Sequence, residues 1–293
     1  MKFGIYYAYW EQEWEADYKY YIEKAARLGF DILEIAASPL PGYSDKQLAE
    51  LKACASDFGI TLTAGHGPSA RQNLSSSDPA VRANAKTFYT DLLKRLCKLD
   101  IRLIGGAIYS YWPVDYTQPI DKAGDWGRSV EGVREIARVA EKCGVSFCLE
   151  VLNRFENYLL NTAEEGVEFV RQVGHPSVKL LLDTFHMNIE EDAMGGAIRT
   201  AGAYLGHLHT GECNRRVPGK GRIPWNEIGE ALQDIGYNGA AVMEPFVRMG
   251  GTVGSDIKVW RDISRGADEA GLDTEARDAL SFSRRILENR NTL

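Results

Sequence analysis

The sequence has no long apolar run and few cysteines, and both absences narrow the class of protein. No apolar stretch approaches the ~18 residues that a membrane-spanning helix needs, and acidic residues interrupt the N-terminal segment from Glu11 onward. We therefore expect neither a membrane span nor a secretory signal peptide. The five cysteines, an odd number, form no C-x-x-C pair. That pattern favours reduced thiols and a cytoplasmic location over a disulfide framework or a zinc knuckle.

An excess of positive charge is also missing. The 41 acidic residues outnumber the 34 basic ones, and the formal net charge is −7 at pH 7. Nucleic-acid binding relies on Lys and Arg contacts to phosphates, so the composition argues against a nucleic-acid partner. Hydrophobic residues make up 44% of the chain and charged residues 26%, which is typical of a globular protein. We predict a neutral small molecule as the ligand, with no membrane partner.

Short apolar runs alternate with amphipathic stretches along the whole chain. The runs that have the length and composition of buried strands are 3–7, 31–36, 60–65, 101–106, 146–151, 178–183, 205–210 and 240–245. The helical patterns are 16–28, 44–58, 79–99, 127–143, 162–173, about 192–203, 226–235 and 271–289. Several of these end in a Gly-containing turn before the next strand, as helices in βα units do.

Eight such units in 293 residues predict an α/β protein with a single (β/α)8 TIM barrel, one domain over residues 1–293. The alternative is a doubly wound open sheet, but the chain contains no G-x-G-x-x-G or Walker A pattern. The longest segment without periodicity, 109–127, follows the fourth strand, and we expect it to act as a lid or an interface element.

The C-terminal ends of the last four predicted strands carry ligand-type side chains, where TIM barrels place their active sites. These residues are Glu150, Asp183, His209 and Glu244, separated by 33, 26 and 35 residues, one βα unit each. A single strand-end carboxylate is more often a helix cap or an ion-pair partner, and Asp183 in LLLDTFHMN fits a cap as well. Four at equivalent positions favour a metal site, because three clustered carboxylates repel one another without a cation.

More polar and aromatic residues lie close to these positions in the sequence. Oxygen ligands with one imidazole suit a hard to borderline divalent ion, Mn²⁺, Mg²⁺ or Co²⁺, better than structural zinc. His66 ends the third strand and is read either as a substrate contact or as a support of the metal shell. The remaining candidates combine hydrogen-bonding groups with flat apolar walls, which suit a polyhydroxy ligand: Tyr6, Trp112, Glu156, His186, Arg215 and Phe246.

Four segments of this sequence, CLEVLNRFEN, LLLDTFHMNIEE, GHLHTGECNRR and VMEPFVRMGG, resemble the D-tagatose 3-epimerase family of ketose 3-epimerases. The segments GIYYAYWEQEW and GHGPSA fit the same family, and the resemblance extends over essentially the whole chain. The broader group of xylose-isomerase-like barrels shares the fold and part of the ligand set. The resemblance implies a metal-dependent isomerase of carbohydrate metabolism that interconverts D-fructose and D-psicose (D-allulose) through a cis-enediolate.

The resemblance also implies roles for the candidate residues. Glu150, Asp183, His209 and Glu244 match the ligands of one Mn²⁺ or Co²⁺ per subunit, in preference to Mg²⁺, and the two glutamates also match the acid–base pair. The residues that match contacts to the O1–O3 end of the ketose are Glu156, His186 and Arg215, and those that match less specific pocket positions are Tyr6, Trp112 and Phe246. D-Tagatose is a further expected substrate, and a homodimer or homotetramer is the expected assembly.

Several functions remain as alternatives. An aldose–ketose isomerase of the same fold usually uses a second metal site with more Asp and His ligands, and this chain has five histidines. A phosphosugar epimerase needs a phosphate site, for which the basic segment NRRVPGKGR is a candidate. A sugar- or metal-binding barrel without turnover is the non-enzymatic alternative, and hydrogen exchange at C3 of a ketose would distinguish it from an epimerase.

Overall fold

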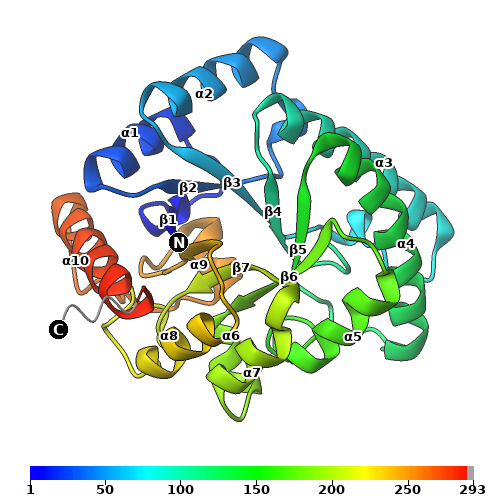
Figure 1. Ribbon diagram of the computed structural model, residues 1–293. Helices are drawn as coiled ribbons and strands as arrows, with labels where there is room; N and C mark the ends of the chain where they lie inside the picture. Colours follow the sequence, from blue (N-terminus) through cyan, green and yellow to red (C-terminus); the bar gives the residue numbers. More distant parts are fainter. Residues whose placement is uncertain (289–293) are drawn as a thin grey trace.

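The computed structural model describes residues 1–288, and its strands form one closed barrel in the order β1 to β8 (Figure 1). Every neighbouring pair of strands is parallel, including β1 with β8. The strands are β1 (Lys2–Tyr6), β2 (Ile32–Ala36), β3 (Thr61–His66), β4 (Leu103–Gly106), β5 (Ser146–Glu150), β6 (Val178–Asp183), β7 (Leu205–Thr210) and β8 (Ala240–Met243). The predicted TIM barrel is confirmed.

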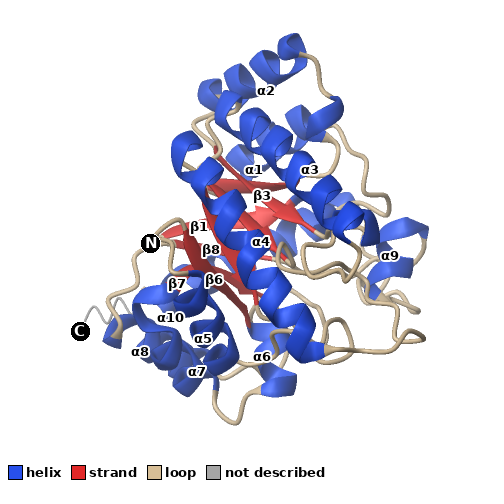
Figure 2. Cartoon of the chain, turned by 90° about the vertical axis from the view of Figure 1, so that its right-hand side faces the viewer, coloured by secondary structure: helices blue, strands red, loops and turns tan. Residues whose placement is uncertain are grey.

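Helices cover the outside of the barrel, and Figure 2 shows them around the strands. The α-helices are α1 (Tyr18–Leu28), α2 (Asp45–Asp57), α3 (Pro79–Lys98), α4 (Lys122–Cys143), α5 (Ala163–Val173), α6 (Thr184–Glu190), α7 (Met194–Ala201), α8 (Trp225–Asp234), α9 (Gly251–Ile257) and α10 (Glu269–Leu287). Short 3-10 helices are η1 (Tyr7–Tyr9), η2 (Leu40–Gly42), η3 (Ala70–Gln72) and η4 (Gly202–Tyr204). No helix in this part of the chain is both long and apolar enough to cross a membrane.

Local signals explain where many of these helices begin and end. The Asp17 side chain accepts a hydrogen bond from the backbone N–H of Lys19 at the start of α1, and Gly29 ends that helix with φ at 89°. Ser44 and Gln47 form a complete capping box at the start of α2. A left-handed residue after a helix allows the chain to turn back toward the barrel, which is why glycine serves there.

Two helices and some boundaries differ from the sequence prediction. The seven-residue helices α6 and α9 were not predicted, because neither is long enough to show a 3.6-residue period. Helix α4 begins at Lys122 rather than at residue 127, so the connection after β4 is shorter than expected. The last helix begins at Glu269 instead of 271, and residue 289, its predicted end, lies outside the described residues.

Candidate active site

Four potential ligands meet at the C-terminal mouth of the barrel. Glu150 and Asp183 end β5 and β6, His209 is the penultimate residue of β7, and Glu244 directly follows β8. Each offers one oxygen or nitrogen atom, and these atoms all lie within 4.8 Å of one another. The parallel register brings the strand ends together, since Asp183 pairs with His209 across β6 and β7. The structure therefore brings the four predicted residues together at this end of the barrel.

Two buried atoms of this group have no hydrogen-bond partner, namely Oδ2 of Asp183 and Nδ1 of His209. Nδ1 of His209 lies 3.7 Å from Oε1 of Glu150 and 3.7 Å from Oε1 of Glu244. Unpaired buried polar atoms cost free energy unless something binds them. Three carboxylates and one imidazole that converge in this way fit a single divalent cation, so the cluster is a candidate metal site.

Asp183 has two roles that the sequence had presented as alternatives. Its Oδ1 atom accepts a hydrogen bond of 2.9 Å from the backbone N–H of Phe185 and so caps α6. Its Oδ2 atom faces the other three candidate ligands and lies 3.5 Å from Nη1 of Arg215. One oxygen therefore positions the side chain while the other remains available to a ligand.

Burial and the crowded carboxylates at the mouth shift the pKa values of two groups. Burial first, and then the Glu150 and Asp183 carboxylates, raise the pKa of Glu244 well above its ordinary value, although His209 and Arg215 oppose the shift. Burial alone would lower the pKa of His209, but Glu244 and Glu34 raise it well above the ordinary value. Without a cation, bound protons offset the crowded negative charge; a divalent cation supplies the same compensation.

A second group of polar residues borders the cluster. Nδ1 of His186 lies 3.3 Å from the backbone N–H of Asn153, which requires Nδ1 to be the acceptor, and 2.8 Å from the Asn153 amide nitrogen. In neutral His186 the proton is therefore on Nε2, which lies 3.7 Å from Oε1 of Glu150 and 3.6 Å from Oδ2 of Asp183. His186 thus presents an N–H group to the cavity.

Glu156 receives several polar contacts on one carboxylate. The Asn153 amide donates to Oε1 at 3.0 Å, and Nε1 of Trp112 donates to Oε2 at 3.0 Å. Arg215 lies 3.4 Å from Oε1. Burial alone would raise the pKa of Glu156, but His186, Arg215 and these hydrogen bonds lower it. Glu156 therefore remains a carboxylate that accepts hydrogen bonds.

Arg215 reaches the site from the loop after β7 with an uncommon backbone conformation, φ at 62°. Its guanidinium stacks on Phe185, 3.6 Å from the ring centroid, and lies 3.6 Å from Oε2 of Glu244. The loop is anchored by the buried Glu212 carboxylate, which accepts hydrogen bonds from the backbone of Gly219 and Ile223 and from Nε1 of Trp225. The loop and the stacking hold one positive charge among the acidic groups.

A cavity of about 770 Å³ opens onto this group of residues. All seven residues predicted to contact substrate line it: Tyr6, His66, Trp112, Glu156, His186, Arg215 and Phe246. Trp112 belongs to the segment predicted as a lid or interface element, and its backbone N–H bonds to the Pro68 carbonyl at 2.7 Å. Nδ1 of His66 lies 3.2 Å from the Ser38 hydroxyl, and burial lowers the pKa of His66 to about 3, so that ring is neutral.

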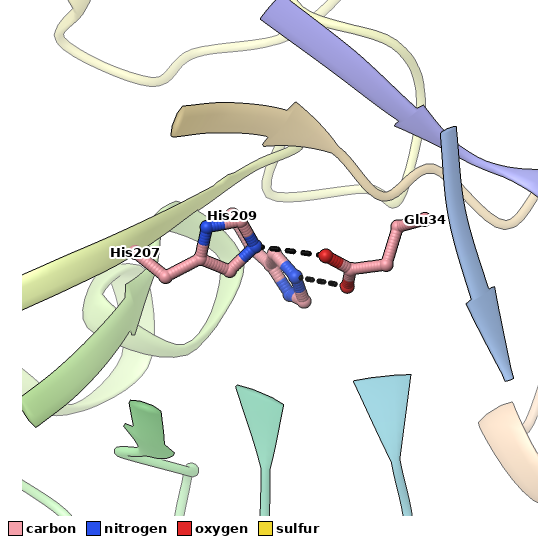
Figure 3. Close-up of side chains that lie close together, drawn as sticks. All are labelled: Glu34, His207 and His209. Carbon is pink, nitrogen blue, oxygen red and sulfur yellow. Dashed lines mark hydrogen bonds and ion pairs between the residues drawn. The ribbon is translucent and has the colours of Figure 1, made fainter. Parts of the chain in front are cut away.

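Sequence reasoning missed three residues that support the site. Trp14 lines the cavity and contacts Trp112 and Phe246 edge to face. Asn153 joins His186 to Glu156, as described above. Glu34, in the middle of β2, is fully buried and bonds to His207 and His209 (Figure 3). The sequence held only one signal for the group formed by Glu34, His207 and His209. His207 and His209 alternate along one strand, and their side chains do lie on the same side of β7.

Known proteins share this architecture. Residues 22–274 match the family described as xylose isomerase-like TIM barrel. The chain is 80% identical over 288 residues to the D-psicose 3-epimerase of Ruminiclostridium cellulolyticum, with 98% of each chain covered. The crystal structure of D-psicose 3-epimerase with D-tagatose from Clostridium cellulolyticum has a TM-score of 0.98 at 80% identity and covers 98% of this chain and 100% of that one. A D-psicose 3-epimerase structure in the presence of D-fructose has a TM-score of 0.97 at 63% identity and covers 98% and 99%.

Proposed function

The chain belongs to the xylose isomerase-like TIM-barrel family and, within it, to the ketose 3-epimerases, and on this premise we propose how its residues carry out the reaction. The protein is an isomerase that inverts C3 of a ketose. We propose D-fructose and D-psicose as its substrate pair, with D-tagatose as a further substrate. The similar structures obtained with D-tagatose and with D-fructose support this choice of ketohexoses.

The observation that carries the proposal is the convergence of Glu150, Asp183, His209 and Glu244 at the barrel mouth. We propose that these four residues hold one Mn²⁺ or Co²⁺, with Mg²⁺ a weaker fit to a site that includes an imidazole. When bound, such an ion acts as a Lewis acid that draws electron density from the C2 carbonyl and acidifies the C3 proton.

Glu150 and Glu244 then act as the acid–base pair. They come from β5 and β8, with β6 and β7 between them, so they approach C3 of the sugar from opposite faces. One carboxylate takes the C3 proton, the C–H electron pair forms the C2–C3 double bond, and the carbonyl electrons move to O2. The other glutamate, protonated, donates its proton to the opposite face of C3 while the C2 carbonyl re-forms. The roles of the two glutamates exchange in the reverse direction.

Other residues hold the sugar around this centre. The Nε2–H group of His186, the Glu156 carboxylate and the Arg215 guanidinium are placed to bind the O1–O3 end, and Arg215 adds positive charge where the enediolate develops. Tyr6, Trp112 and Phe246 form apolar walls, and neutral His66 contributes a ring nitrogen that has no protein partner.

A phosphorylated ketose fits this cavity less well. In the basic segment that could bind phosphate, Arg215 already faces Glu156, Asp183 and Glu244. Arg216 pairs with Glu275 at 2.9 Å. Neither guanidinium is available as a dedicated phosphate ligand, and the other two basic residues of the segment, Lys220 and Arg222, do not line the cavity, which favours an unphosphorylated sugar.

We propose the same assembly as the sequence suggested, a homodimer or homotetramer, in the cytoplasm. Tyr116, Ile120 and Trp260 are exposed apolar residues in the connections after β4 and β8, with 71% exposure at Trp260. Exposed apolar side chains in such loops favour contacts between subunits. All five cysteines are free thiols, which suits a reducing compartment. Light scattering of the purified protein measures the assembly.

The test of the chemistry is deuterium exchange at C3. We expect that D-fructose incubated in heavy water with the metal-loaded protein gives D-psicose labelled at C3. Glu150→Gln or Glu244→Gln should stop this exchange while bound metal remains, because the amide keeps an oxygen ligand but is a poor base. Glu141→Gln, on an exposed side chain of α4, is the control. Full exchange in either active-site variant would disprove the two-carboxylate scheme.

A further inference from the structure

Inside the barrel, next to the candidate metal site, Glu34 forms a polar group with His207 and His209 (Figure 3). Glu34 lies on β2, while His207 and His209 lie on β7, across the barrel interior. Glu34 and His207 are fully buried, and only 2% of His209 is exposed. A buried carboxylate is costly unless strong donors surround it, so its partners define its role.

The two carboxylate oxygens have different partners. Oε1 of Glu34 lies 2.8 Å from Nε2 of His209. Oε2 lies 2.9 Å from Nε2 of His207 and accepts a hydrogen bond of 2.7 Å from the hydroxyl of Thr63. One oxygen therefore serves His209 alone, and the other is held by His207 and Thr63.

This arrangement decides which nitrogen of His209 carries a proton. A carboxylate only accepts hydrogen bonds, so Nε2 of His209 must be the N–H donor toward Oε1. In the neutral ring, Nδ1 then has a free lone pair, and Nδ1 is the atom that lies 3.7 Å from Glu150 and 3.7 Å from Glu244. A negative partner behind the ring also makes that lone pair a stronger donor to a cation.

We propose that Glu34 is a positioning residue that fixes the tautomer and orientation of His209 and thereby sets the affinity of the metal site. The inference deepens the proposed function and rests on it, since it requires that the four residues at the barrel mouth bind a divalent ion. His207 and Thr63 hold the second oxygen of Glu34, so the carboxylate cannot turn away from His209.

The three residues Glu34, His207 and His209 could themselves be considered as a metal site, because their ligand atoms lie within 4.8 Å of one another. The contacts argue against that role. Both imidazole Nε2 atoms are already at hydrogen-bond distance from Glu34, and an ion between them would have to replace both bonds. The group supports the mouth of the barrel and is not a second metal centre.

The experiment compares metal binding by the parent chain and by Glu34→Gln, each prepared metal-free. Calorimetric titration with Mn²⁺ should show an affinity about 10- to 100-fold lower for the variant, the usual effect of losing such an outer partner. The visible absorption of the Co²⁺-loaded protein should change as well, because the ligand field depends on His209. Thermal melting of the metal-free proteins measures folding separately.

Thr63→Val is the matched control, because it removes one bond to Oε2 and leaves the contact between Oε1 and His209. We expect its Mn²⁺ affinity to stay within about threefold of the parent, because His207 still holds Oε2 of Glu34. A purely structural role for Glu34 would lower the melting temperature of Glu34→Gln and leave the Mn²⁺ affinity unchanged, and that result overturns the inference. If Glu34→Gln does not fold, Glu34→Asp replaces it: the shorter side chain withdraws from His209, and unchanged affinity again overturns the inference. A parent chain that binds neither Mn²⁺ nor Co²⁺ overturns the proposed metal site as well.

Discussion

Strands β5–β8 and strands β1–β4 present different side chains to the same cavity. The residues at or next to the ends of β5–β8 are Glu150, Asp183, His209 and Glu244. Those at the ends of β1–β4 are Tyr6, Ala36, His66 and Gly106. The strand ends of one half are therefore crowded with acidic groups, and those of the other half carry neutral residues. A pocket with a charged wall and a neutral wall can bind an ion and polar oxygens on one side while it packs the carbon skeleton on the other.

The difference predicts that the two halves have separate functions. Substitutions in the β5–β8 half should act on metal binding and on kcat, because that half carries the proposed metal ligands and the proposed acid–base pair. Substitutions of the cavity-lining residues in the β1–β4 half should act on KM or on stability. Glu34 on β2 is the exception, because it acts through His209 of the other half. The following four predictions test this division, and a change of kcat where a change of KM is expected would contradict it.

The largest effect is expected for Asp183→Asn. The asparagine oxygen can still accept the hydrogen bond from Phe185, so the cap of α6 should survive. While that oxygen caps the helix, the amide nitrogen, which cannot bind a cation, takes the place of Oδ2 at the site. Mn²⁺ binding should therefore weaken at least about a hundredfold, with a proportional loss of kcat. Calorimetry and steady-state kinetics measure both. Asp78→Asn, a cap of the same geometry at α3, is the control and should leave both unchanged.

Arg215→Lys should have the next largest effect. A lysine ammonium cannot keep the stacking on Phe185 together with the contacts to Glu156 and Glu244. We expect kcat/KM to fall roughly 10- to 100-fold, mostly through kcat. Arg216→Lys, which alters only the neighbouring pair with Glu275, is the matched control. Equal losses in the two variants would remove any special role for Arg215.

Trp112→Phe tests the neutral half. Phenylalanine keeps an aromatic wall but removes the hydrogen bond from Nε1 to Glu156. A hydrogen bond to a charged group contributes about 1.5 kcal/mol or more, so KM should rise roughly tenfold with little change in kcat. Trp126→Phe removes an indole hydrogen bond to the neutral Gln172 amide, outside the cavity, and should change neither constant. A large fall in kcat for Trp112→Phe would break the division between the halves.

The smallest effect on catalysis is expected for Gly29→Ala, in the turn between α1 and β2. Gly29 has φ at 89°, which costs an alanine roughly 1 kcal/mol, so the melting temperature should fall by about 2 °C with kcat unchanged. Gly127→Ala lies within α4, where nothing is within 4 Å of the added methyl group, and it should leave stability equal or slightly higher. Equal destabilisation by both would rule out the backbone explanation.

The pattern of apolar and polar residues in the sequence predicted most of the barrel and the residues at the strand ends. All eight strands were predicted, because buried parallel strands are short apolar runs bounded by Gly-containing turns. The four candidate ligands could be found because each lies near the end of a strand and successive ones are separated by one βα unit. They are Glu150, Asp183, His209 and Glu244. The helices α6 and α9 could not be found, since seven residues carry no readable period.

Residues that act through distant partners could not be predicted in this way. Glu34 looks like an ordinary polar residue of the segment DILEIA, and its partners His207 and His209 are 173 and 175 residues away. Glu212 follows β7 like any loop residue, yet its buried carboxylate anchors the loop that carries Arg215. No local sequence pattern indicates either role, because the hydrogen-bond partners come together only when the barrel closes.

Periodicity and residue type along the chain are enough to predict the type of barrel, the strand ends that carry the candidate ligands and the acidic character of the site. Which atoms face one another depends instead on how the barrel closes. Barrel closure set Glu34 against His209 so that Nδ1 points to the metal cluster, and it divided the oxygens of Asp183 between a helix cap and the site. Those choices depend on the direction of side chains across the barrel, which the order of residues along the chain does not specify.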